Sequence, residues 1–190
     1  MVRGFLLSDV AMARHASVII IGGGQAGLSI SYCLKQLDND HIVFEKEKIA
    51  HSWRSKRWDT FCLVTPNWQC TLPGYHYPGS APNGFMQRDE IVQYIEDYAR
   101  HFDPPVQEGV TVSRARRIDD RYEIATSQGD YTADQVVVAT GGDHHPKIPR
   151  MAERLPATVT QLHSSQYKKP EALPDGAVLV VGTGQSGCQI

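Results

Sequence analysis

The chain has 190 residues, of which 41% are hydrophobic and 21% are charged, and its formal net charge is −2. These values are ordinary for a globular protein, and the lack of a basic excess argues against nucleic acid as a partner. No run approaches the roughly 18 apolar residues of a membrane span, no secretory leader pattern is present, and none of the four cysteines is spaced as CxxC. We therefore expect a cytoplasmic protein with reduced cysteines, no membrane span and no metal site.

A βαβ unit is predicted near the N-terminus, after residues 1–11, which precede Met12 and are expected to be disordered or to lie upstream of the true start. Residues 17–21, SVIII, are typical of a buried parallel strand. Residues 25–37 place apolar side chains at helical spacing, and residues 41–46, HIVFEK, have the pattern of a second buried strand.

A glycine motif, Gly22-x-Gly24-x-x-Gly27, lies between the first predicted strand and the helix. In this context its glycines allow a tight turn, close approach of the backbone to a pyrophosphate, and close packing of the helix on the sheet. The phosphates would meet the free N–H groups and the positive end of the helix dipole. Glu45, at the end of the second strand, can accept hydrogen bonds from a ribose diol. The unit therefore predicts a dinucleotide site.

The middle of the chain is less regular. Residues 49–87 contain all three tryptophans, and we expect a short helix near 50–57 followed by an ordered, irregular segment. Residues 88–102 predict an amphipathic helix that ends at Asp103-Pro104-Pro105. Short strands over 106–131 predict an antiparallel meander, and residues 135–140 predict a further buried strand that ends at Gly141-Gly142.

A second glycine motif, Gly182-x-Gly184-x-x-Gly187, follows the apolar run AVLVV at 177–181, which predicts another strand. Residues 143–177 contain several prolines and predict a connecting segment. Two such motifs indicate two dinucleotides, one for each unit. The residue that selects a ribose 2′-hydroxyl or a 2′-phosphate would lie on the strand after the second helix, so the choice between NADH and NADPH stays open.

The chain resembles the flavin-containing monooxygenase family, above all its bacterial members. The resemblance rests on the two glycine motifs, the triplets FEK and SWR, and the segments VVVATG, PKIP and RWDTFCLVTPNWQCTLPGYHYPG. The resemblance covers about residues 16–190 and the first half of a family member. It implies a truncated α/β fold with two dinucleotide-binding domains, Rossmann-like βαβ units and an antiparallel meander. Residues 12–150 would form an incomplete FAD-binding domain, 151–173 a connecting segment, and 174–190 the start of an NAD(P)-binding domain.

The resemblance also implies roles for individual residues. The cofactor-binding residues would be Gly22, Gly24, Gln25, Ala26 and Gly27 at the FAD pyrophosphate, Glu45 at the adenosine ribose with Lys46 after it, Ser52, Trp53 and Arg54 along the FAD, Val110 with its backbone at the adenine, Thr140 and Gly141 near the flavin, and Gly182, Gly184, Gln185, Ser186 and Gly187 at the nicotinamide dinucleotide. Thr65 and Asn67 match a Thr-Asn pair beside the flavin ring, although Pro66 separates them here. Asn67 is the candidate catalytic residue.

A family signature that joins the two fingerprints is half present: His163 and Tyr167 match it, whereas Ala157 and Val159 replace its Phe and Gly. Baeyer–Villiger members of the family tend to have Trp at the position of Tyr167, so the resemblance implies oxygenation at a heteroatom. His163 is equally explained as a linker residue that packs or as a cofactor contact. Residues 143–145, Asp-His-His, have a metal-ligand composition, but a solvated loop is the simpler interpretation.

The resemblance implies an FAD- and NADPH-dependent monooxygenase that uses O2 and a C4a-peroxyflavin to oxygenate N, S or carbonyl groups of a small organic substrate, with a homodimer as one assembly when full length. Two alternatives are a non-oxygenating FAD-dependent NAD(P)H oxidoreductase and a flavin-binding regulatory protein. Cys62 and Cys70 are too far apart for a CxxxxC disulfide reductase motif, while a CxxC after residue 190 stays open. Residues 1–190 alone are expected to be inactive.

Overall fold

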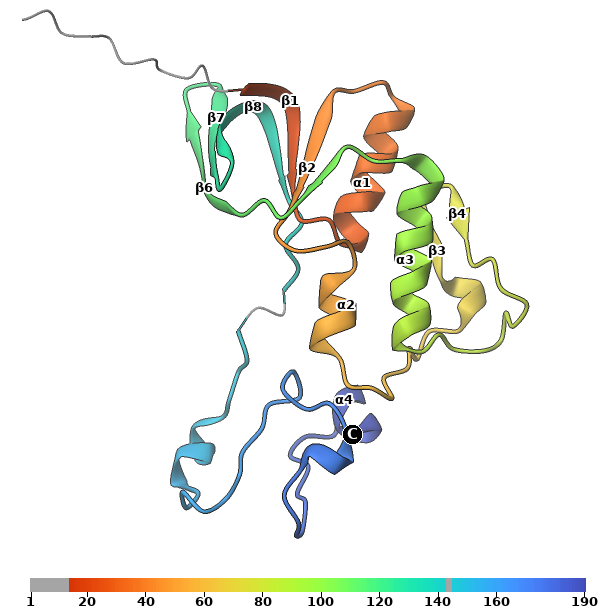
Figure 1. Ribbon diagram of the computed structural model, residues 1–190, viewed down its shortest axis with the longest axis vertical. Coiled ribbons are helices and arrows are strands. Elements are labelled where there is room, and N and C mark those ends of the chain that lie inside the picture. The colour runs from red at the N-terminus through yellow and green to blue at the C-terminus, as the bar shows by residue number, and fades with distance from the viewer. Residues whose placement is uncertain (1–13, 143–144) are drawn as a thin grey trace, which may run out of the picture.

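A six-stranded sheet is the centre of the molecule, a computed structural model that describes residues 14–142 and 145–190 (Figure 1). The strand order is β5-β2-β1-β8-β7-β6. The strands are β1 (Arg14–Ile21), β2 (His41–Glu45), β5 (Val106–Glu108), β6 (Val112–Ile118), β7 (Arg121–Thr126) and β8 (Gly129–Val138). The neighbours from β5 to β8 pair in parallel, and β8, β7 and β6 form an antiparallel meander. The predicted α/β fold is therefore confirmed.

The N-terminal βαβ unit is present as predicted. Between β1 and β2 runs α1 (Gln25–Gln36), and Ile19 and Ile20 on β1 are completely buried. A strand that is buried on both faces needs a continuous apolar run, which explains the sequence SVIII. Ser31 on α1 donates to His41 Nε2 at 2.8 Å, so one buried polar contact also joins the helix to β2.

The two strands predicted at the end of the meander and at residues 135–140 are one strand, β8. It pairs with β1 along nearly its whole length and with β7 through its first half. No turn residue interrupts it, and Asp134 is tolerated because its carboxylate is half-exposed and lies 3.5 Å from both His15 and Arg121. The expectation of a break at this point was wrong.

Residues 106–108 also differ from the prediction, since they leave the meander and form the fourth parallel strand, β5. The N–H of Val43 donates to Pro105 O at 3.0 Å, and β5 then pairs with the end of β2. The two prolines therefore stop the preceding helix and also bring the chain back to the edge of the sheet.

The strand predicted at residues 177–181 is absent. Val178, Leu179 and Val181 are between 63% and 85% exposed, and no strand among the described residues lies beside this run. A strand is stable only when a neighbour accepts and donates its ladder hydrogen bonds. An apolar, β-branched sequence is therefore insufficient by itself to form one here.

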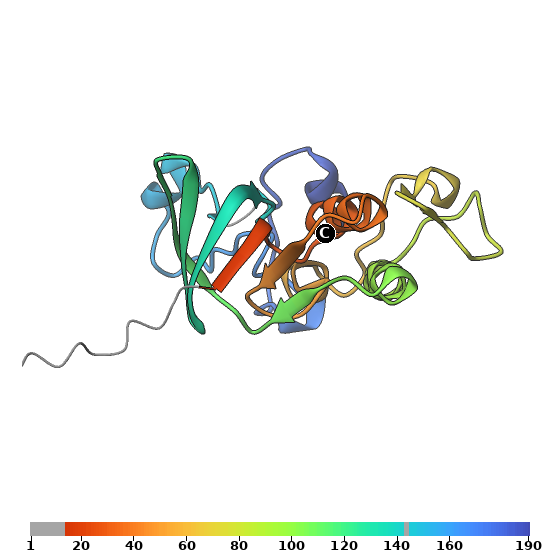
Figure 2. The same cartoon turned by 90° about the horizontal axis from the view of Figure 1, so that it is seen from above.

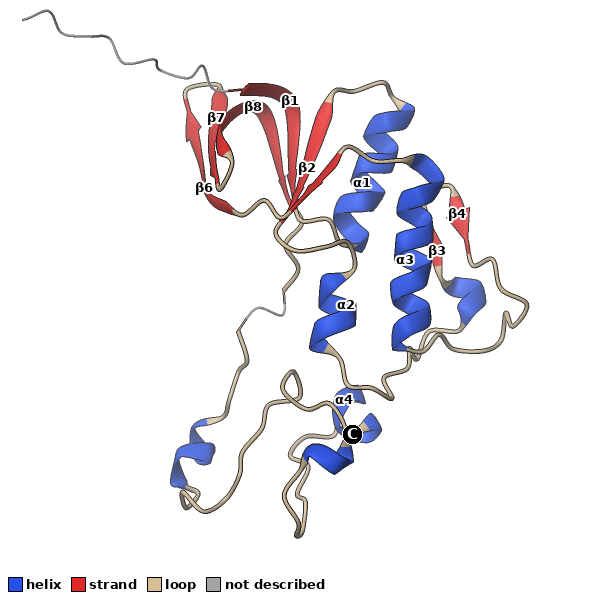
Figure 3. Cartoon of the chain, in the orientation of Figure 1, coloured by secondary structure: helices blue, strands red, loops and turns tan. Residues whose placement is uncertain are grey.

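Helices gather at one side of the sheet, and most of the last fifty residues run as loops below them (Figures 1 and 3). The view from above separates the meander from the helical side (Figure 2). The remaining elements are α2 (His51–Lys56), α3 (Arg88–Phe102), α4 (Gln185–Gln189), the hairpin β3 (Thr71–Leu72) and β4 (Tyr75–His76), and the 3-10 turns Asn67–Gln69, Arg150–Arg154 and Pro170–Ala172. The largest apolar cluster joins α3 to α2 and to the irregular segment.

Tyr94 on α3 gives this cluster a pH dependence. Its hydroxyl donates to Cys70 O at 2.9 Å, and burial raises its pKa to about 12. Because the folded-state pKa lies above the unfolded value, the stabilisation is complete below about pH 10 and is lost as the pH rises through about 12. We expect the free energy of unfolding to fall across this window, and to fall less steeply in Tyr94→Phe. Urea denaturation at several pH values measures both slopes, and equal slopes would contradict the assignment.

Some expectations concern residues outside the described ranges, and others concern absences that can be stated only of the described residues. Residues 1–11 and the pair 143–144 lie outside the described residues. Among the residues that are described, no helix has the length and apolar character to cross a membrane. Within the same ranges, no group of three or more potential metal ligands is gathered.

Candidate functional site

The first glycine motif forms a tight turn at the carboxyl end of β1. Gly22 has a φ of +112°, and its N–H donates to Phe44 O at 2.8 Å. A Cβ at this position would lie 2.4 Å from Ala139 O. The turn thus passes directly against the chain that leaves β8, and only glycine fits both the φ angle and the contact.

Glu45 lies against this turn. One carboxylate oxygen, Oε2, accepts from the Gly23 N–H at 2.6 Å, and Oε1 accepts from the Glu47 N–H at 2.9 Å. These contacts hold the Glu45 carboxylate against the glycine turn, where the sequence predicts an acceptor for the ribose hydroxyls. Gly23 belongs to the motif but was not among the predicted site residues; its role follows only from the contact with Glu45.

The N-terminus of α1 is suited to an anion. The helix has no acidic residue in its first turn, no side chain among the described residues caps it, and Gln25 and Ala26 are exposed. Its first amides therefore have no acceptor within the helix and carry the positive end of its dipole. A Cβ on Gly24 would meet no atom of the described part of the chain within 4 Å, so open space adjoins this turn. A pyrophosphate fits the charge and the shape of this position.

Other predicted residues converge on the same edge of the sheet. The Val110 N–H donates to Glu45 O at 2.9 Å, and the Ala139 N–H donates to Ile21 O at 2.8 Å. Thr140 and Gly141 follow directly, and Gly141 has a φ of +78°. Lys46 is exposed next to Glu45. The ends of β1, β2 and β8 and the start of the meander therefore form one constellation, which matches the crevice position in open α/β sheets.

The triplet Ser52, Trp53 and Arg54 lies on α2, and its three side chains have different surroundings. Ser52 is exposed, and Arg54 forms an ion pair with Glu96 on α3. The Trp53 ring packs against Phe61, with ring centroids 5.7 Å apart. Trp53 is thus a component of the core, and only its remaining surface is free to meet a ligand.

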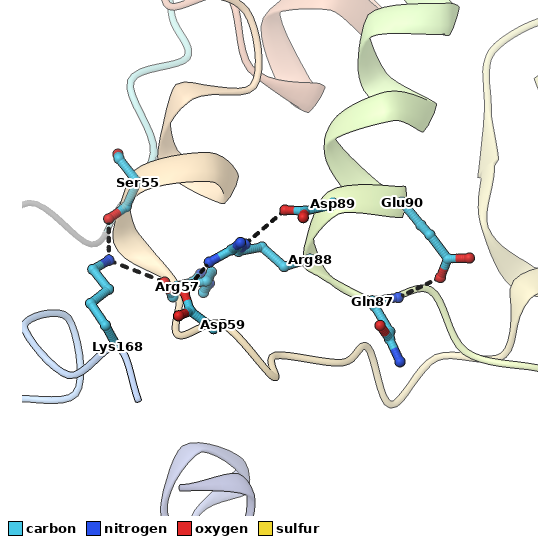
Figure 4. A network of polar contacts seen from close by, with 8 residues as sticks. All are labelled: Ser55, Arg57, Asp59, Gln87, Arg88, Asp89, Glu90 and Lys168. Carbon is cyan, nitrogen blue, oxygen red and sulfur yellow. Dashed lines mark hydrogen bonds and ion pairs between the residues drawn. The ribbon is translucent and has the colours of Figure 1, made fainter. Parts of the chain in front are cut away.

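Lys168, which the sequence did not single out, caps the C-terminus of α2 from the connecting segment (Figure 4). Its ammonium donates to Ser55 O and, at 3.1 Å, to Arg57 O. Orphan carbonyls at a helix end favour a cation. The neighbouring Tyr167 is buried in the main cluster. On the other side of the same view, Arg88 at the start of α3 bonds Asp59 and Asp89.

Replacing Lys168 by methionine is expected to lower the free energy of unfolding by about 1–3 kcal/mol, because two carbonyls at the end of α2 lose a charged donor. The exposed neighbour Lys169, changed in the same way, is the matched control and should cost less than about 0.5 kcal/mol. Chemical denaturation measures both. Equal losses in the two variants would show that the contacts in Figure 4 contribute nothing specific.

Thr65 and Asn67, the pair predicted to lie beside the flavin ring, are in the irregular segment. Thr65 is exposed, whereas Asn67 is 3% exposed. The Asn67 amide nitrogen donates to Ala81 O at 2.9 Å, and its Oδ1 has no hydrogen-bond partner among the described residues. A buried, unpaired acceptor is costly. The Oδ1 atom of Asn67, the predicted catalytic residue, is therefore still able to accept a hydrogen bond.

The second glycine motif reproduces the first. Gly182 has a φ of +117°, and a Cβ on Gly187 would lie 2.3 Å from Gly182 O, as one on Gly27 would lie 1.9 Å from Gly22 O. Gly184 precedes α4 in the same extended conformation as Gly24 before α1. Gln185 and Ser186 begin α4 and are exposed. The turn thus forms although the preceding strand does not.

The two motifs are not brought together in the described residues. The second one instead contacts the irregular segment, through Gln189 at the end of α4, whose side chain bonds the backbone of Cys62. Gln189 was not predicted, and no local pattern in the sequence could have indicated a contact between residues so far apart in the chain.

A parallel sheet with a glycine turn at the end of β1, an uncapped helix behind it and an acidic side chain at the end of β2 defines a dinucleotide-binding α/β protein. The chain belongs to the family of pyridine nucleotide-disulphide oxidoreductases, whose model matches residues 19–190.

Individual relatives give a more specific comparison than the family as a whole. It is 42% identical over 180 residues to an uncharacterized CzcO-like oxidoreductase of Geobacillus kaustophilus, covering 94% of this chain and 51% of that protein. It is 31% identical to the probable indole-3-pyruvate monooxygenase YUCCA4 of Arabidopsis thaliana, covering 90% and 42%. A flavin monooxygenase from Stenotrophomonas maltophilia matches in structure with a TM-score of 0.82 and 27% identity, covering 93% and 53%. The resemblance to flavin-containing monooxygenases is confirmed, and the chain spans about half the length of these relatives.

Proposed function

We propose that this chain is the N-terminal part of an FAD- and NAD(P)H-dependent flavoprotein monooxygenase. The observation that carries the proposal is the open, uncapped N-terminus of α1 beside Gly24, held next to the carboxylate of Glu45. An adenine dinucleotide needs an anion site and a ribose acceptor at this spacing. The names of the relatives, several of which are monooxygenases, support a flavin as the dinucleotide and oxygen as its co-substrate.

The residues of the chain would act by binding and orientation. Gly22, Gly24 and Gly27 with the first amides of α1 would hold the FAD pyrophosphate, and Glu45 would accept from the adenosine ribose. The backbone at Val110 would meet the adenine, and the turn at Thr140 and Gly141 would lie near the flavin. Bound FAD supplies hydride acceptance from NADPH and the activation of O2.

Asn67 is proposed as the polar group beside the reacting ring. Its free Oδ1 can accept a hydrogen bond while its amide nitrogen is already fixed to Ala81. A fixed, buried acceptor can orient a donor without reorganising during the reaction. The second turn, from Gly182 to Gly187, would bind the pyrophosphate of the nicotinamide dinucleotide; NADPH is the proposed reductant, and NADH stays open.

The remaining expectations are proposals of the same kind. We place an FAD-binding unit at residues 12–150, a connecting segment at 151–173 and the start of an NAD(P)-binding unit at 174–190. A small organic substrate with an oxidisable N, S or carbonyl group, a cytoplasmic location and a homodimer complete the proposal.

Rapid mixing of the full-length protein tests the reaction. The FAD-loaded protein should be reduced by NADPH without oxygen. After O2 is added, a transient absorbance between about 370 and 390 nm should precede the return of the oxidised flavin spectrum. Reduction by NADPH without this transient would identify a non-oxygenating oxidoreductase instead. Bound flavin that NADPH does not reduce would favour a regulatory flavin-binding protein.

A further inference from the structure

The side chain of Gln189 binds the backbone N–H and C=O of one residue, as a neighbouring strand would. Its Nε2 donates to Cys62 O at 2.8 Å, and its Oε1 accepts from the Cys62 N–H at 3.3 Å. Both polar atoms of one side chain therefore bind both backbone groups of one residue. This pairing joins residues 127 positions apart, so it fixes α4 against a distant part of the chain.

The segment that Gln189 contacts is extended and already held on its opposite edge. The Leu63 N–H donates to Met86 O, and Phe61 O accepts from the Arg88 N–H, each at 2.9 Å. In an extended chain the N–H and C=O of one residue point to the same edge, and those of the next residue point to the opposite edge. Cys62, which bridges Gln87 in an antiparallel pair, therefore presents its N–H and C=O away from Met86 and Arg88. Gln189 binds that other edge, and the segment lies between α4 and the start of α3.

The contact between Gln189 and Cys62 connects the second glycine turn to the segment that contains Asn67. Gln189 follows Gly187 by two residues, and the Cys188 N–H donates to Gly184 O at 3.2 Å, which makes the turn and α4 one short helical unit. On the other side, the segment runs on from Cys62 to Asn67, whose own N–H donates to Gly84 O at 2.9 Å. The position of Gln189 is thereby tied to the position of Asn67.

We propose that Gln189 is a positioning residue that couples occupancy of the second glycine turn to the conformation of residues 61–67. The inference rests on the proposed function, because it takes the ligand of that turn to be the pyrophosphate of a nicotinamide dinucleotide. A ligand that holds the first turn of α4 also holds its last residue, and so strengthens the pairing with Cys62. By linkage, a well-formed 61–67 segment favours binding of the dinucleotide to the same extent.

Hydrogen exchange separates coupling from simple structural support. The full-length, FAD-loaded protein is compared with Gln189→Met, which keeps the size of the side chain and loses both hydrogen bonds. The matched control is Gln36→Met on the exposed end of α1. Without nucleotide, we expect amide exchange over residues 61–67 to be about fivefold to tenfold faster in Gln189→Met, and unchanged in the control.

The response to NADP+ is the decisive measurement. In the wild-type protein and in Gln36→Met, saturating NADP+ should slow exchange over residues 61–67 by about fivefold to tenfold. In Gln189→Met the same addition should leave it unchanged, while calorimetry still detects NADP+ binding with about fivefold to tenfold weaker affinity. Should Gln189→Met be unstable, the wild-type response to NADP+ tests the coupling without it.

Two results overturn the coupling while leaving the proposed function intact. One is a wild-type protein that binds NADP+ with no change in exchange over residues 61–67, and the other is a Gln189→Met variant that responds as the wild type does. A wild-type protein that binds neither NADP+ nor NAD+ in the calorimeter refutes the proposed function, and the coupling with it. Calorimetry therefore tells the two failures apart.

Discussion

Replacing Gly24 by alanine is expected to weaken FAD binding by about tenfold to a hundredfold without destabilising the FAD-free protein. No atom of the described residues lies within 4 Å of a Cβ at this position, and its φ of −82° is open to alanine. The added methyl would occupy the space through which the backbone approaches the pyrophosphate. Titration of the FAD-free protein with FAD measures the affinity, and thermal unfolding without FAD measures stability.

Gly27→Ala is the informative partner of this variant. Its Cβ would lie 1.9 Å from Gly22 O and 3.3 Å from the Ile20 side chain. The helix must therefore move away from the sheet, which should cost about 1–3 kcal/mol of unfolding free energy in addition to FAD affinity. If Gly24→Ala destabilised the FAD-free protein as much as Gly27→Ala does, the space beside Gly24 would have a structural role, and the proposed phosphate site would be wrong.

Glu45→Gln is expected to lower FAD affinity by about tenfold to a hundredfold, which corresponds to about 1.4–2.8 kcal/mol. A charged acceptor of the ribose hydroxyls would become a neutral one. The change should also loosen the turn, since the amide that replaces one oxygen cannot accept from both the Gly23 and Glu47 N–H groups as the carboxylate does. FAD titration and chemical denaturation measure the two effects.

Glu47→Gln is the matched control for this experiment, because the Glu47 side chain is exposed only two residues away. It should change FAD affinity by less than about twofold. Equal affinity in wild type, Glu45→Gln and Glu47→Gln would remove the ribose from the proposed role of Glu45. The turn contact with Gly23 would then be its whole function.

The strands and helices that the sequence predicted correctly are those whose pattern is strong and local. The helix at 88–102 was placed at its observed bounds because its apolar face and the following prolines mark it without reference to any other element. The short helix near 50–57 was also found, as α2. The continuity of β8 and the pairing of β5 were missed, because both depend on which strand lies alongside.

The candidate site divides along the same line. The glycine turns and the position of Glu45 could be predicted from spacing, since each depends mainly on residues nearby in the chain. Lys168 and Gln189 could not, because each binds backbone groups that lie more than a hundred residues away along the chain. Every residue has a backbone C=O, and all but proline have an N–H, so no sequence pattern indicates which of these groups a distant side chain will bind.

By itself, the sequence determined the conformation of both glycine turns. Gly182 takes the same positive φ as Gly22 although no paired strand precedes it, because this turn depends on backbone sterics and on contacts within a few residues. Only the tertiary structure decided which apolar runs became strands. Residues 18–20 have neighbouring strands on both sides and are buried, whereas residues 177–181 have no neighbouring strand among the described residues and stay exposed. A strand needs partners for its peptide groups, and those partners are supplied by distant parts of the chain.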